Sequence, residues 1–303
     1  MLNILRRKKS EISASKGNTT VLLNGVRAVQ AAEIIKKRFR FSGSVVSDAG
    51  SVRANNEDNY VLGQYINHNS ADHSETSVSF SDTSGDWQFA GVFDGMGGGE
   101  MGELASRDTA AIFLAAFRRI SGAQSKAEVD LTIRSAFLEA NNRIVALQKE
   151  YRVFGTTGTV LCSNGLEFKL YHLGDSRAYL VRGDELLQLT KDQTLAQMKL
   201  EVGMYNEDDP AAEADKHKLT EYIGRDWTKE NLNPVESLWL PIESGDHILL
   251  CSDGLYDMCS NEEIAEILWR NASTSDKAVQ LVRAAVSHGG EDNVTCIVVA
   301  FTK

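Results

Sequence analysis

The sequence predicts an α+β domain in which helices pack in layers against sheets. Two observations lead to this prediction. Strand patterns and helix patterns occupy separate blocks of the chain, whereas parallel folds alternate strand and helix one by one. The chain also has 303 residues, of which 42% are hydrophobic, so it can bury a sizeable core.

The N-terminal block supplies three strands and then two long helices. Apolar, strand-like runs are predicted at residues 41–46, 60–64 and 87–93, with a polar loop at residues 67–86 that we interpret as an insertion. Apolar residues from Ile133 to Leu147 recur at steps of three and four, which is the spacing of an amphipathic helix. We therefore expect helices over residues 101–120 and 128–151.

The C-terminal block begins with short strands of the kind found in an antiparallel meander. These strands are predicted at residues 157–162, 166–173, 177–181 and 185–189. Residues 191–236 are polar and irregular, with one helix predicted at 195–202, so we expect them to form a flap. Strands at 237–240 and 247–251, helices at 262–271 and 276–288, and a last strand at 294–301 complete the prediction.

The charge of the chain is divided unevenly. Residues 1–40 hold ten Lys and Arg but only two acids, a net charge of +8, so the total of −10 leaves −18 for residues 41–303. We interpret residues 1–40 as a basic appendage in which residues 21–40 could form a helix. It is either a solvated tail or short surface helix, or a segment that docks to a partner or an anionic membrane surface. The acidic body argues against a nucleic-acid substrate. No run reaches the roughly 18 apolar residues of a membrane span, so we expect a cytoplasmic protein.

The cysteines and histidines show no zinc-binding spacing. The four cysteines lie in or beside apolar runs and form no CxxC pair. They are Cys162, Cys251, Cys259 and Cys296. We expect buried, reduced thiols, and structural or exposed roles for all six histidines, including His172, His217 and His288.

Aspartates stand at the ends of the predicted strands. Three apolar runs close with Asp94-Gly95, Gly174-Asp175 and Ser252-Asp253, and Asp292 stands just before the last strand. Each aspartate alone is an ordinary turn residue. If the strands belong to one packed sheet system, however, the four carboxylates gather at one edge, where their mutual repulsion calls for cations.

Such a cluster suits a hard divalent cation. Carboxylates, a glycine carbonyl and retained waters are typical ligands of magnesium or manganese, whereas zinc favours His or Cys. The run from Arg53 to Asp58 adds one fixed cation and two acids. Because Arg recognises phosphate through paired hydrogen bonds and paired metals activate a water for in-line attack, these residues indicate phosphoester hydrolysis.

In their order along the chain, these motifs resemble those of the metal-dependent protein phosphatases, the type 2C serine/threonine phosphatases, and most closely the bacterial members. The resemblance spans residues 43–300. It is carried by DAGSVRANNED from Asp48, DGMGG from Asp94, GTT from Gly155, GDSR from Gly174, SDGL from Ser252 and EDNVT from Glu291.

The resemblance implies a four-layer αββα sandwich, two antiparallel sheets flanked by helices, with residues 41–303 as the catalytic domain. It implies hydrolysis of phosphoserine and phosphothreonine by a water activated at a binuclear Mg²⁺ or Mn²⁺ centre. Phosphorylated proteins would be the substrates, and a serine/threonine kinase system the partner.

The resemblance also assigns roles to residues. Asp94 would bridge the two metals, the Gly95 carbonyl would bind one of them, and Asp253 and Asp292 would bind the other. A third, weaker metal site would use Asp175, Asp253 and Asp257. Arg53 would hold the substrate phosphate. Residues expected to orient the metal-bound waters are Glu57, Asp58 and Asn293.

Two departures from the family keep alternatives open. Met96 stands where eukaryotic members have a histidine proposed as general acid, and the segment 213–224 lacks the usual His-Pro and Arg of the bacterial flap. The main alternative is a catalytically weak regulator that binds a phosphoprotein or a kinase. A metal phosphodiesterase or nuclease is less favoured because the body is acidic.

Overall fold

The computed structural model describes residues 38–67, 76–82, 87–148, 153–206, 209–227, 232 and 234–303. Arg38–Lys303 form one unit, distinct from residues 1–37. Most of the helix expected at 21–40 therefore lies outside the described residues, and Arg40 itself opens a strand. No helix in the described part of the chain is long and apolar enough to cross a membrane.

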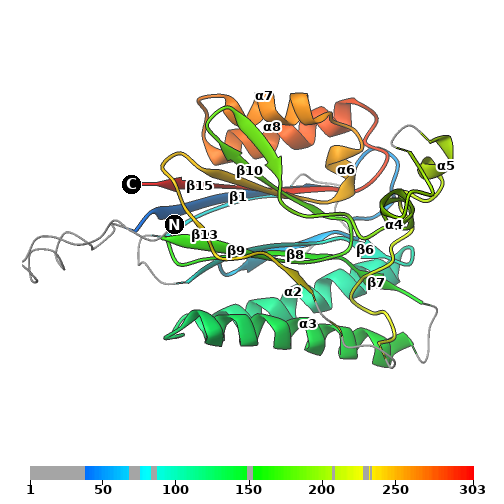
Figure 1. Cartoon of the computed structure of the whole chain (residues 1–303), viewed down its shortest axis with the longest axis horizontal. Coiled ribbons are helices and arrows are strands. Elements are labelled where there is room, and N and C mark those ends of the chain that lie inside the picture. Colours follow the sequence, from blue (N-terminus) through cyan, green and yellow to red (C-terminus); the bar gives the residue numbers. More distant parts are fainter. Residues whose placement is uncertain are drawn as a thin grey trace, which may run out of the picture. The chain divides into compact units, whose positions relative to one another are not determined.

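Two antiparallel sheets face each other within this unit (Figure 1). The first has the order β11-β10-β14-β15-β1-β4. Its strands are β1 (Arg40–Asp48), β4 (Thr76–Asp82), β10 (Arg177–Arg182), β11 (Glu185–Gln188), β14 (His247–Cys251) and β15 (Val294–Thr302). The longest pairing joins β1 to β15, with Arg40 opposite Thr302 and Asp48 opposite Val294.

The second sheet has the order β12-β9-β8-β5-β2-β3, and β13 also pairs with β9. Its strands are β2 (Asn59–Leu62), β3 (Tyr65–Ile66), β5 (Gln88–Phe93), β8 (Gly158–Ser163), β9 (Glu167–Leu173), β12 (Val235–Glu236) and β13 (Leu240–Pro241). A separate two-stranded ladder joins β6 (Gly95–Met96) to β7 (Gly155–Thr156).

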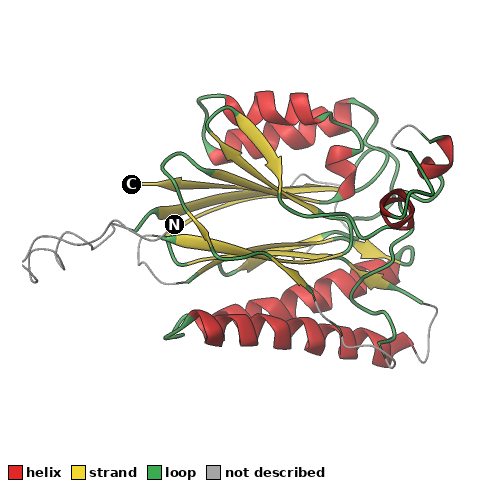
Figure 2. Ribbon diagram, in the orientation of Figure 1, coloured by secondary structure: helices red, strands yellow, loops and turns green. Residues whose placement is uncertain are grey.

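Helices cover the outer face of each sheet, so the predicted αββα sandwich is confirmed (Figure 2). The second sheet carries α2 (Glu100–Ile120) and α3 (Lys126–Gln148), and the first carries α6 (Asp253–Tyr256), α7 (Asn261–Trp269) and α8 (Thr274–Ser287). The remaining described helices, α4 (Leu195–Glu201) and α5 (Pro210–Glu213), belong to the expected flap.

Three apolar clusters fill the spaces between these layers. Phe113 and Phe137 pack from α2 and α3 onto the second sheet. Phe168 and Phe301 meet between the two sheets, and Leu281 packs from α8 onto the first sheet. Burial of such side chains stabilises a fold by about 1.5–3 kcal/mol each relative to exposure. The layers are thereby fixed, and so are the strand ends that they carry.

Two sequence predictions were wrong. Part of the loop predicted at 67–86 forms β4, an edge strand whose Val78 and Phe80 pack against the cluster between the sheets. An edge strand needs only one apolar face, so serines alternate with the apolar residues of β4. This polar composition is why the sequence predicted a loop. The strand predicted at 237–240 is instead split into β12 and β13, two short pairings with β9.

Candidate metal centre

The ends of strands from both sheets surround one cavity of about 510 Å³. The four strand-end aspartates of the sequence all line it: Asp94 after β5, Asp175 after β9, Asp253 after β14, and Asp292 before β15. Other predicted site residues that line the cavity are Arg53, Glu57, Gly95, Asp257 and Asn293. Residues up to 240 positions apart in the chain, Arg53 and Asn293, are thus brought to one place.

Two threonines fix the backbone of Asp94: Thr156, which ends β7, and Thr157, which follows it. The Asp94 amide donates to Thr157 Oγ1 at 2.9 Å, and its carbonyl accepts from the Thr157 amide and from Thr156 Oγ1, both at 2.8 Å. Because these three bonds satisfy the backbone at the strand end, the side chain is free to face the cavity.

Two glycines allow Glu57 to approach the beginning of α2. A Cβ on Gly102 would lie 1.8 Å from Glu57 Oε2, and one on Gly95 would lie 2.5 Å from the Glu57 carbonyl oxygen. The other carboxylate oxygen, Oε1, accepts from the Gly99 amide at 2.8 Å. The helix N-terminus, which favours negative charge, therefore holds Glu57 at the cavity wall.

Asn293 ties the loops around Asp292 together. Its Oδ1 accepts from the Glu57 amide at 2.8 Å, and its Nδ2 donates to the carbonyls of Ala49 and Asn55, both at 2.9 Å. Both amide N–H groups are therefore taken by backbone. Nearby, a Cβ on Gly254 would lie 2.1 Å from the Asn293 carbonyl oxygen, so only glycine lets α6 come this close.

Asp58 is a predicted site residue that does not line the cavity. Its side chain is buried, and its Oδ2 accepts from Ser252 Oγ at 2.7 Å. Its Oδ1 has no hydrogen-bond partner among the described residues. Burial raises the pKa of Asp58 to about 7. A buried carboxylate oxygen without a hydrogen-bond partner destabilises the fold, so a further partner at Oδ1 would be stabilising.

The cavity opposes negative charge on its own carboxylates. Burial, reinforced by repulsion from neighbouring aspartates, raises the pKa of Asp94 and Asp175 well above the ordinary value. The pKa of Asp292 is raised in the same way, although Arg53 Nη2 lies 2.5 Å from its Oδ2 and acts against the shift. Added positive charge would stabilise the ionised form of these carboxylates.

The flap supplies positive charge that the sequence did not reveal. Lys216 Nζ lies 2.6 Å from Asp257 Oδ1. His217 Nδ1 lies 3.3 Å from Asp253 Oδ2, and its Nε2 lies 3.5 Å from Asp257 Oδ2. His217 is exposed, as expected, but the sequence did not indicate that its ring meets two carboxylates of the cavity. No spacing in the sequence could have shown this, because the contact depends on how the flap folds back.

Comparisons with known proteins agree with this arrangement. Residues 69–289 match the sequence profile of the family described as protein phosphatase 2C, so the chain belongs to that family. "Serine/threonine protein phosphatase PstP" of Mycobacterium tuberculosis is 33% identical over 255 residues, which are 83% of this chain but 43% of that protein. The chain thus spans less than half the length of this relative.

Two further comparisons cover the other protein almost completely. "Protein phosphatase PhpP" of Streptococcus pneumoniae is 31% identical over 268 residues, which are 86% of this chain and 97% of that protein. The crystal structure of the PstP catalytic domain in complex with two manganese ions superposes with a TM-score of 0.68 at 29% identity, over 88% of this chain and 100% of that one.

Proposed function

We propose that the chain is a metal-dependent protein phosphatase that hydrolyses phosphoserine and phosphothreonine at a binuclear Mg²⁺ or Mn²⁺ centre. The convergence of four strand-end aspartates on one cavity, with Arg53 at its edge, carries this proposal. The names of the relatives and the two manganese ions bound to one of them support it. When bound, the two ions would activate a water for in-line attack on phosphorus and neutralise the phosphate.

The residues of the cavity fit hard divalent cations. The candidate ligands are carboxylates and a glycine carbonyl, the donor set that Mg²⁺ and Mn²⁺ prefer. The raised pKa of Asp94 and the unpaired Oδ1 of buried Asp58 both indicate that no positive charge offsets the burial of these two carboxylates. Bound cations would remove both penalties, because they stabilise the ionised carboxylates.

Four residues would form the centre. Asp94 would bridge both cations from the end of β5, and the Gly95 carbonyl would bind one of them. Asp253 and Asp292 would bind the other, since Gly254 lets their two segments come together.

Other residues would place the waters and the substrate. Glu57 and Asp58 would orient waters around the cations, with Asn293 positioning the backbone of Glu57. Arg53 would hold the phosphate; its pairing with Asp292 leaves further N–H groups of the guanidinium for this purpose. Asp175, Asp253 and Asp257 would form a third, weaker site, now contacted by the flap.

We further propose residues 41–303 as the catalytic domain and residues 1–40 as a basic appendage that docks a partner or an anionic membrane surface. The substrates would be phosphorylated proteins, and the opposing enzymes a serine/threonine kinase system. The charge of +8 over residues 1–40 supports the docking role. The expected cytoplasmic location stays a prediction.

A weakly catalytic regulator that binds a phosphoprotein or a kinase remains the second candidate. The observation that favours it is Met96, which lines the cavity next to Gly95 and has no proton to give to a leaving oxygen. In an active enzyme that proton must come from another group or from solvent.

Hydrolysis of a phosphothreonine peptide separates the two candidates. We expect turnover with Mn²⁺ or Mg²⁺, its loss on chelation, and its loss in Asp94→Asn. Activity that survives chelation would rule out the metal mechanism. Equal, negligible rates in wild type and Asp94→Asn, together with unimpaired binding of the phosphopeptide, would favour the regulator.

A further inference from the structure

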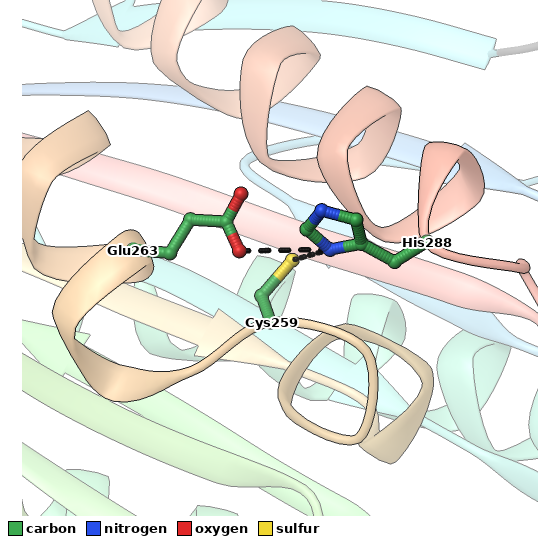
Figure 3. Close-up of side chains that lie close together, drawn as sticks. All are labelled: Cys259, Glu263 and His288. Carbon is green, nitrogen blue, oxygen red and sulfur yellow. Dashed lines mark hydrogen bonds and ion pairs between the residues drawn. The ribbon is translucent and has the colours of Figure 1, made fainter.

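Three side chains of types that can bind a metal meet outside the cavity, beside the C-terminal end of α8 (Figure 3). Cys259 lies in the loop between α6 and α7, Glu263 in the first turn of α7, and His288 directly after α8. One donor atom from each lies within 4.8 Å of the others. Figure 3 shows the thiol and the carboxylate both turned toward the imidazole.

The donors converge on one ring nitrogen. His288 Nδ1 lies 4.0 Å from Cys259 Sγ, 3.5 Å from Glu263 Oε2 and 2.9 Å from the Met258 carbonyl oxygen. A catalytic relay would need the thiol and the carboxylate on opposite ring nitrogens.

We propose that Cys259, Glu263 and His288, with the Met258 carbonyl, form a site for zinc or a similar divalent transition metal, separate from the carboxylate cavity. A thiolate, an imidazole and oxygen donors suit such an ion, whereas Mg²⁺ and Mn²⁺ favour oxygen alone. Usual zinc bond lengths place tetrahedral ligand atoms about 3.3–3.8 Å apart. His288 Nδ1 lies 3.5 Å from Glu263 Oε2 and 4.0 Å from Cys259 Sγ, close to this range.

Binding of the ion needs no further reactant, because every proton is accounted for. The ion takes the place of the thiol proton, which goes to solvent, and the proton of the neutral imidazole resides on Nε2 while Nδ1 binds the ion. Cys259 is buried, but Glu263 and His288 are partly exposed, with 35% and 44% of their side chains accessible. An ion can therefore reach the site from solvent.

The site would join two segments that frame the cavity. Cys259 follows Asp257 and Met258, which line the cavity, and His288 precedes the loop that leads to Asp292. The carbonyl of Gly290 in that loop accepts from the Ser51 amide at 2.7 Å. An ion at this position would hold both segments to the end of α8 and stabilise the fold, whether or not the chain is a phosphatase.

Cobalt is the probe for the test, because Co²⁺ bound by a thiolate shows sulfur-to-metal charge-transfer absorption. The full-length chain is titrated with Co²⁺ and then with Zn²⁺. We expect the band in wild type, its displacement by Zn²⁺, and its loss in Cys259→Ala. The affinity for Co²⁺ should fall about 10-fold or more in Glu263→Gln and His288→Gln. Cobalt in the carboxylate cavity gives no such band, since no cysteine lines it.

Two controls keep the test specific. Cys162→Ala removes a thiol buried against α2 and α3, and Asp94→Asn alters the carboxylate cavity; both should keep the band. Thermal melting supplies a second measure: Zn²⁺ should raise the melting temperature of wild type more than that of Glu263→Gln, a partly exposed and isosteric change. Absence of the band in wild type, its survival in Cys259→Ala, or equal Zn²⁺ shifts in wild type and Glu263→Gln would overturn the proposal.

Discussion

The floor and the flap of the cavity are built in different ways. The floor consists of Asp94, Asp253 and Asp292, whose backbones belong to the ends of buried strands or to the segments next to them. The flap brings Lys216 and His217 to the same cavity from an irregular segment. The first set of side chains is positioned by the packing of two sheets, and the second by local hydrogen bonds.

Several contacts fix the flap to the rest of the fold. An isolated bridge joins Thr156 to Ile223, and Asp192 pairs with Arg177 of β10. The Gly224 amide donates to Asn141 Oδ1 on α3 at 2.7 Å. Loops that lie on a rigid scaffold commonly tune what the scaffold binds. We therefore expect the chemistry to depend on the floor, and metal or substrate preference to depend on the flap.

The largest effect is expected from Asp253→Asn, which removes a charge from the floor without changing its size. Phosphopeptide turnover should fall by roughly 10³-fold, because the proposed centre loses a ligand and part of its electrostatic stabilisation. The measurement is kcat at saturating Mn²⁺, together with Mn²⁺ binding. Asp184→Asn, in the exposed β10–β11 turn, is the matched control and should be silent. Turnover within about 10-fold of wild type would place the chemistry elsewhere.

A smaller loss is expected when the support of the floor is disturbed. In Gly102→Ala the new methyl group would meet Glu57 Oε2, so that carboxylate must move. Residues that orient metal ligands or waters typically change activity by about 10- to 100-fold. Gly122→Ala, where nothing lies within 4 Å of the added Cβ, is the control. Unchanged kcat and Mn²⁺ dependence in Gly102→Ala would show that Glu57 has no part in the reaction.

The contrast between floor and flap also explains what the sequence could predict. Asp94, Asp175 and Asp253 follow apolar runs, so their shared edge could be inferred once the strands were assigned to packed sheets. That inference needs only local periodicity and turn residues. Helix positions were likewise predictable, and α2 and α8 begin within two residues of the predicted bounds.

Contacts between irregular segments were not predictable in this way. His217 meets Asp253 across 36 positions, and His288 meets Cys259 across 29, with no periodic pattern linking them. Asp58, expected to orient metal-bound waters, does not itself line the cavity, and one of its carboxylate oxygens accepts from Ser252 Oγ. Each of these contacts depends on tertiary packing of turns, which a single sequence does not specify.

The flap should influence metal preference by a few-fold only. Lys216 Nζ pairs with Asp257 Oδ1, an oxygen proposed for the third metal site, so the lysine competes with a cation there. In Lys216→Met we expect the Mn²⁺ concentration for half-maximal activity to fall by about two- to fivefold, the scale of one partly exposed ion pair. Lys191→Met removes a flap lysine that pairs with Glu201 and should leave this value unchanged. A rise in the required Mn²⁺ would contradict the competition.

The smallest effect on turnover is expected from Asp215→Asn, which loosens the flap without touching the cavity. Asp215 accepts hydrogen bonds from Lys199 at 2.5 Å, and from Lys218 and Tyr205 at 2.8 Å, and these bonds lower the pKa of its carboxyl group. The neutral amide loses the charge that holds both lysines, so hydrogen exchange over residues 195–218 should accelerate. Because the floor is anchored independently, kcat should stay within about threefold of wild type. If kcat instead fell as far as in Asp253→Asn while the floor still bound Mn²⁺, the flap would carry part of the chemistry, and the division between a catalytic floor and a tuning flap would fail.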